Sequence, residues 1–196
     1  MSPKKYLPDW PANGRKSFDF SRKDALICKL NGEAPRLPQR YPGGVMITVP
    51  ELAAEALGSY LGEHMGRRFG STDAELIELV QSGARLALDC IGNSDALYHN
   101  VEHTMLVTLV GYDILRGRRL LRDTNASDYA HVLVACLFHD IGYVRGILDG
   151  DSDDGFIIDA KGRKAKLPRG SSDAALLPYH VDRSKLFVLD RIAKIK

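Results

Sequence analysis

Proline is distributed unevenly along this chain of 196 residues. Seven of its nine prolines lie in the first 50 residues, at positions 3, 8, 11, 35, 38, 42 and 50. Because proline lacks a backbone N–H and breaks helix interiors, long helices cannot run through this segment. We therefore predict an extended, proline-rich N-terminal arm over residues 1–49, in which residues 45–49 (Val-Met-Ile-Thr-Val) have the composition of a β-strand.

From Pro50 onward, apolar residues recur at intervals of three and four, which is typical of helices that bury one face. Helices are predicted from Pro50 to a break at residues 70–72, from Thr72 to a break at residues 92–94, from Ser94 through Leu115, from Ser127 to near Gly142, and from Leu186 to Ile195. Thr72 and Glu75 have the spacing of a capping box. Residues 149–170 are expected to form a polar loop. The predicted fold class is all-α.

Residues 50–196 are long enough to form one domain with a core of its own. No glycine cap or polar tail follows the last helical stretch, so we expect that helix to continue in a longer form of the protein or to be completed by another chain. The N-terminal arm and the last helix are therefore the two candidate surfaces for a homo-oligomer.

Composition excludes several classes of protein. No run of about 18 apolar residues is present, so no membrane span is expected. The N-terminus lacks the apolar core of a signal peptide. A net charge of +2 is too small for nucleic-acid binding by bulk electrostatics, and the three cysteines share no metal or redox spacing. These features predict a cytoplasmic protein with reduced thiols and neither a membrane nor a nucleic-acid partner.

Two histidine motifs lie in predicted helices. His99 and His103 are at positions i and i+4, which places them on one face of a helix. His139 and Asp140 end an almost wholly apolar helix, where buried polar groups need partners. A cation shared between the two helices would supply one, with His103, His139 and Asp140 as its ligands. The alternatives are a surface histidine pair and a His139 that caps helix carbonyls.

These residues also match a family pattern. Tyr98-His99-Asn100-x-x-His103, followed after about 35 residues by Phe138-His139-Asp140, resembles the HD-domain metal-dependent phosphohydrolases. The first motif is most similar to that of the class I cyclic-nucleotide phosphodiesterases. A third stretch, residues 179–184, loosely resembles a later Tyr-x-Asp-x-Ser segment of those enzymes. The resemblance spans residues 94–190 and implies an HD-domain helical bundle.

The resemblance implies specific roles. His103 and His139 would bind the tighter metal, and Asp140 would bind that metal and bridge to a second one. His99 would be the general acid that protonates the leaving alkoxide. Mixed imidazole and carboxylate ligands suit zinc, iron or manganese at the first site, and magnesium or manganese at the second.

The substrate side of this site has five candidate residues, namely Tyr98, Asn100, Tyr143, Arg145 and His180. Arg145 is the cation expected to lie closest to a substrate phosphate. Tyr143 takes the place of the last histidine in the His-Asp-x-x-His pattern of the family, where a phenol could line the pocket. His180 is either a second-metal ligand or a core histidine.

The expected function is hydrolysis of a phosphoester, in a nucleotide or a related small molecule, by metal-activated water. The family also supplies a metal-binding aspartate well downstream of the His-Asp pair, and here Asp182 and Asp190 are the remaining helix-region candidates. Neither sits at the family position. The alternative is therefore a catalytically incomplete HD module that binds a nucleotide or a partner protein.

Overall fold

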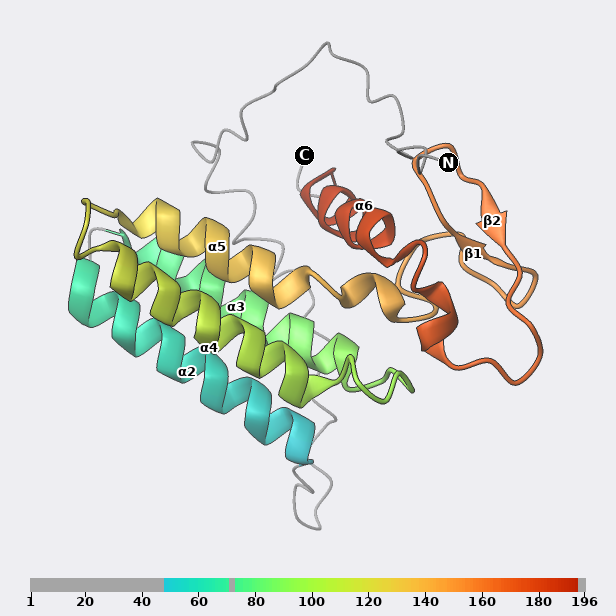
Figure 1. Cartoon of the computed structure of the whole chain (residues 1–196), viewed down its shortest axis with the longest axis horizontal. Coiled ribbons are helices and arrows are strands. Elements are labelled where there is room, and N and C mark those ends of the chain that lie inside the picture. Colours follow the sequence, from blue (N-terminus) through green and yellow to red (C-terminus); the bar gives the residue numbers. More distant parts are fainter. Residues whose placement is uncertain (1–47, 71–72, 194–196) are drawn as a thin grey trace, which may run out of the picture.

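The computed structural model describes residues 48–70 and 73–193, so all of the predicted N-terminal arm except residues 48 and 49 lies outside the described residues. The described part is predominantly helical, as the all-α prediction requires. Its helices are α2 (Val49–Phe69), α3 (Ala74–Ile91), α4 (Val101–Arg118), α5 (Ala126–Phe138) and α6 (His180–Ala193). Short 3₁₀ turns η2 (Ile141–Tyr143) and η3 (Asp173–Leu176) and the antiparallel strand pair β1 (Phe156–Ile157) and β2 (Lys164–Ala165) are the other elements of the described part (Figure 1).

Helix α2 begins earlier than predicted. Thr48 accepts a hydrogen bond from the backbone N–H of Glu51, whose carboxylate accepts one from the backbone N–H of Thr48. This capping box sets the helix start, so the predicted strand is wrong at Val49, while residues 45–47 lie outside the described part. Thr72, of the other predicted capping box, is also outside the described part.

Two further helix boundaries differ from the prediction. Helix α4 begins at Val101 and not near Ser94, because the Asn100 side chain accepts a hydrogen bond from the backbone N–H of His103 and caps the helix there. Helix α6 begins at His180, six residues before the predicted start at Leu186. The first turn of α6 is mostly polar, so the spacing of apolar residues did not predict that it is helical.

Helices α2, α3, α4 and α5 pack side by side as a bundle, with α3 behind α4 in the view of Figure 1. They share a core of leucine, alanine and aromatic side chains that includes Leu61, Met65, Leu88, Tyr129 and Leu133. Burial of each large apolar side chain contributes about 1.5–3 kcal/mol to folding. Among the described residues, no helix combines the length and the apolar character needed to cross a bilayer.

The rest of the described chain, from η2 to α6, packs on one end of α3 and α5 around a second core of Ile91, Ile141, Val144, Leu148 and Phe187. Arg183 of α6 is fully buried in this part. Its guanidinium pairs with the buried Asp151 carboxylate at 2.8 Å and donates to the backbone carbonyls of residues 142, 144 and 157. One side chain therefore joins α6 to η2 and to the β1 segment.

Gly142 lies where η2 meets the start of α6, and no larger residue fits there. A Cβ at this position would sit 2.0 Å from the carbonyl oxygen of His180 and 2.7 Å from the backbone nitrogen of Ser184. The Gly142 N–H donates to the Ser184 hydroxyl at 2.9 Å. The missing side chain is thus a condition for docking α6 beside the His139-Asp140 segment.

Gly142→Ala is expected to lower the free energy of unfolding by more than about 2 kcal/mol, because two backbone segments must separate. Urea denaturation followed by circular dichroism measures the loss. Gly117→Ala is the matched control, since a Cβ at that helical position meets nothing within 4 Å and should stabilise by about 0.5–1 kcal/mol. Equal effects of the two substitutions would contradict the close approach at Gly142.

Candidate metal centre

Four imidazole rings converge on the carboxylate of Asp140, which is almost completely buried. Its Oδ2 atom lies 2.7 Å from Nδ1 of His99, 2.9 Å from Nε2 of His139 and 3.2 Å from Nε2 of His103. Its Oδ1 atom lies 3.8 Å from Nε2 of His180. The structure thus brings together the predicted ligands of α4 and α5 and adds a histidine from α6.

The side chains around Asp140 come from the start of α4 and from the end of α5. His103 lies in the first turn of α4, whereas His99 lies in the bend before it, so the prediction that both share one helical face is wrong. His139 is the C-cap of α5, and Asp140 has left the helix, with φ −107° and ψ 3°. Neighbouring residues diverge on a regular helix, and this departure lets His139 and Asp140 meet at one point.

The hydrogen bonds of two rings indicate which nitrogen is free. Nδ1 of His139 donates to the Cys136 carbonyl at 2.7 Å, and Nδ1 of His180 donates to the Leu177 carbonyl at 2.7 Å. In the neutral tautomer, Nε2 of each ring then carries a lone pair directed toward Asp140. A backbone carbonyl on the outer nitrogen is the usual arrangement for a metal-binding histidine.

Two imidazole nitrogens meet at the centre of the cluster. Nε2 of His139 lies 3.3 Å from Nε2 of His103, so either a proton on Nε2 of His103 or a bound cation satisfies the lone pair of His139. Ligand atoms of His99, His103 and Asp140 all lie within 4.8 Å of one another. This set of imidazoles with one carboxylate could therefore hold a metal ion.

The charge distribution of the cluster shifts two pKa values. Burial raises the pKa of Asp140, but hydrogen bonds from His139 and His99 outweigh it and lower the pKa to about 2. The same hydrogen bond raises the pKa of His139, against the opposing effect of its burial. Asp140 is therefore an anion over the whole physiological pH range.

Tyr143 is buried between two rings of the cluster. Its ring stacks on His99 with centroids 4.2 Å apart and on His180 with centroids 4.5 Å apart. Its hydroxyl is buried without a hydrogen-bond partner among the described residues. Burial, and secondarily the charge of Asp140, raises the pKa of this phenol. The phenol is thus a neutral wall of the site, as the sequence suggested for this position.

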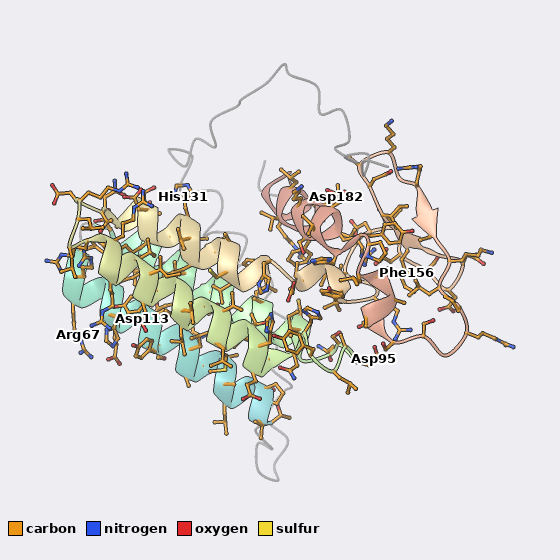
Figure 2. All side chains as sticks on the ribbon, in the orientation of Figure 1. Arg67, Asp95, Asp113, His131, Phe156 and Asp182 are labelled. Carbon is orange, nitrogen blue, oxygen red and sulfur yellow. The ribbon has the colours of Figure 1, made fainter. Side chains whose placement is uncertain are left out.

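Arg145 is engaged by two carboxylates. Its guanidinium pairs with Asp95 at 2.8 Å and with the buried Asp173. Asp95 also accepts from the backbone N–H of Asp173, and Asp173 accepts from the Ser94 hydroxyl at 2.8 Å. Figure 2 labels Asp95 on the loop before α4. The predicted phosphate-binding cation therefore ties the segment that carries His99 to η3.

The remaining predicted residues have different surroundings. Tyr98 is exposed and its ring lies 4.8 Å from that of His103, while Asn100 serves as the cap of α4. Asp182 is exposed on α6 and pairs with Lys185 (Figure 2). Asp190 lines a separate cavity with Leu148, Ile157 and Leu186. The structure places neither later aspartate at the cluster.

Sequence reasoning missed the residues that support the cluster. Ser184 accepts from the Gly142 N–H and donates to the His139 carbonyl at 2.9 Å, and Arg183 binds the Gly142 carbonyl. An arginine next to a serine in a polar helical turn carries no signal of burial by itself. Only the apolar residues around it in space identify Arg183 as a core residue.

Metal binding by the cluster should strengthen as the pH rises. Because the pKa of His139 is raised, its ring keeps a proton to a higher pH, and this proton must leave before Nε2 can bind a metal. Isothermal titration with Mn²⁺ between pH 5.5 and 8 should show affinity rising about tenfold per pH unit and then levelling off above the pKa of His139. An affinity independent of pH would contradict this ligand assignment.

Tyr143→Phe and Tyr129→Phe form a matched pair, because both hydroxyls are buried without a hydrogen-bond partner among the described residues. Tyr129 is the control, since it lies in the bundle core beside Phe69 and Tyr112. Each change should stabilise the metal-free protein by about 1 kcal/mol in urea denaturation. Both variants should keep their Mn²⁺ affinity within about threefold, because the hydroxyl of Tyr143 bonds to no ligand and phenylalanine keeps the stacked ring. A loss of about tenfold in Tyr143→Phe alone would contradict this and give the hydroxyl of Tyr143 a direct role at the metal.

Comparison with known proteins identifies a family. The family model described as Npun_R2479-like covers residues 47–196 of the chain, a description that names no activity. Neither the curated proteins nor the solved structures that were searched contain a match. Since the model spans well over half of the sequence, the chain belongs to the Npun_R2479-like family.

Proposed function

We propose that this protein is an HD-type, metal-dependent phosphohydrolase that cleaves a phosphoester of a nucleotide or a related small molecule. The observation that carries the proposal is the convergence of His103 from α4 with His139 and Asp140 from the end of α5, at 2.9–3.3 Å. The order and spacing of these residues are those that resemble the HD-domain enzymes in the sequence.

In this proposal His103, His139 and Asp140 hold the metal. A divalent ion bound there would supply a hydroxide nucleophile at neutral pH and Lewis-acid stabilisation of the phosphoryl oxygens. Asp140 stays ionised because its pKa is about 2, so it offers a full negative charge to a cation. The Cys136 carbonyl keeps the proton of His139 on Nδ1 and its lone pair on Nε2.

His99 is the proposed general acid. Its Nδ1 is hydrogen-bonded to Asp140 at 2.7 Å, which orients the ring. Its ring is held flat against Tyr143, and its side chain remains partly exposed. The other ring nitrogen, Nε2, has no hydrogen-bond partner among the described residues, so it can give a proton to the leaving alkoxide.

A catalytically incomplete HD module that binds a nucleotide or a partner protein is the second candidate. It is favoured by the positions of Asp182 and Asp190, which both lie away from the cluster. The engagement of Arg145 by Asp95 and Asp173 favours it as well, because that cation is already neutralised. In this candidate the imidazoles would bind a metal without turnover.

Three histidine and aspartate variants test the catalytic proposal. With Mn²⁺ and bis-p-nitrophenyl phosphate, the unaltered protein should contain metal and release p-nitrophenol. Asp140→Ala should lose both metal and turnover, since the carboxylate is at the centre of the ligand set. His99→Ala should keep the metal, measured by elemental analysis, and slow turnover by roughly a hundredfold. His131→Ala, on the exposed side of α5, is the control and should keep both.

Two outcomes would redirect the proposal. Bound metal without hydrolysis of any phosphoester would support the binding module. Loss of metal in His99→Ala would make His99 a ligand, which the proximity of His99, His103 and Asp140 within 4.8 Å permits, and would remove the general-acid role.

A further inference from the structure

Helix α4 presents an apolar ridge to solvent. Leu106, Val110 and Ile114 follow one another at intervals of four residues, and they are 56%, 57% and 63% exposed. The opposite side of the helix is packed, with Thr104, Thr108 and Leu115 buried. Val132 of α5 is also exposed, and it lies beside Gly111 of α4, so the apolar surface continues onto the neighbouring helix.

Opposite charges end this ridge. Glu102 precedes Leu106 by four residues, and Arg118 follows Ile114 by four, so each lies eight residues, or about 12 Å along the axis, from Val110. Both side chains are exposed, and neither has an ion-pair or hydrogen-bond partner among the described residues. Asp113 and Arg116, which are also exposed on α4, already pair with each other.

We propose that this ridge is a self-association surface, on which a second copy of the chain docks its own α4 in the antiparallel direction with Val110 at the two-fold axis. Leu106 then meets Ile114 of the second copy, and Glu102 meets Arg118 of the second copy. Rows of residues at four-residue spacing are the ridges that most often interdigitate when two helices pack. The inference is independent of the reaction proposed for the metal centre.

The charge pattern is the reason to choose a second copy as the occupant. A two-fold axis makes the same patch face itself, so a self-docking patch must be complementary to itself. The ridge meets this condition because Glu102 and Arg118 are opposite in sign and equally distant from Val110. The parallel arrangement would place Glu102 against Glu102 and Arg118 against Arg118. Antiparallel docking thus satisfies both charges, twice in each dimer.

The expected association is of moderate strength. A single helix pair buries less than the roughly 800 Å² per partner of a standard stable interface, so we expect a dissociation constant on the order of 10 µM. On α6, by contrast, the exposed apolar residues Val181 and Leu189 are eight positions apart. They do not form a continuous row, which makes α6 a control surface.

Sedimentation equilibrium of the full chain, from about 1 to 500 µM, tests the proposal. The unaltered protein should form dimers, and Val110→Asp should raise the dissociation constant at least about a hundredfold, because it places two carboxylates at the symmetry axis. Leu189→Asp is the matched control, an equally exposed apolar residue on α6, and should leave dimerisation unchanged. Circular dichroism and thermal unfolding verify that both variants fold.

Charge reversal tests the register. Glu102→Arg and Arg118→Glu should each weaken dimerisation by about tenfold, since each creates two like-charge contacts. The double variant should recover an affinity within about threefold of the unaltered protein, because the pairs are restored with inverted sign. A protein that is monomeric at every concentration, a dimer that survives Val110→Asp, or a double variant that stays weak would each overturn the proposal.

Discussion

Arg183 carries its positive charge inside the protein, and the chain around it is arranged to satisfy that charge. The guanidinium meets the Asp151 carboxylate and three backbone carbonyls from η2, the following loop and β1. Removing one partner of such a buried pair leaves an uncompensated charge and typically costs about 3–5 kcal/mol. Because the acceptors come from segments without long regular structure, this interaction gives them a defined position on α6. The chain beyond α5 is therefore held by a buried polar contact in addition to its own apolar core, whereas the α2–α5 bundle is held by apolar packing.

This position of α6 supports the geometry of the candidate metal centre. Ser184, the neighbour of Arg183, binds the His139 carbonyl and the Gly142 N–H, so the turn that carries Asp140 is held from one side. The ion pairs of Arg145 hold the segment before α4 from the other side, through Asp95 and Asp173. Arg183 and Arg145 thus stabilise the two segments that carry the ligand side chains. The imidazoles converge on one carboxylate because His99 lies in the bend before α4 and Asp140 has left the helical conformation of α5.

Much of the candidate centre could be predicted from the sequence. The apolar helix that ends in His139-Asp140 predicted that these groups need a partner, and His103 lies where that prediction expects it. The place of His99 could not be predicted from its spacing to His103, because the Asn100 cap starts α4 after His99. Arg145 was expected at a substrate phosphate because it follows Asp140 by five residues in the sequence. Its carboxylate partners, Asp173 and Asp95, are 28 and 50 residues away in the chain, so no local sequence pattern predicts these ion pairs.

The sequence by itself determined the helical class of the described chain, most of its helices and the three groups from which a metal site can be built. Periodicity, capping residues and the need to satisfy buried polar groups are local properties, and they act on neighbouring residues. The tertiary structure alone decided that His180 and Tyr143 stack beside the same carboxylate, that Arg183 is buried, and that Leu106, Val110 and Ile114 of α4 are exposed. These outcomes depend on which distant segments share space, and that follows from the packing of whole helices against one another.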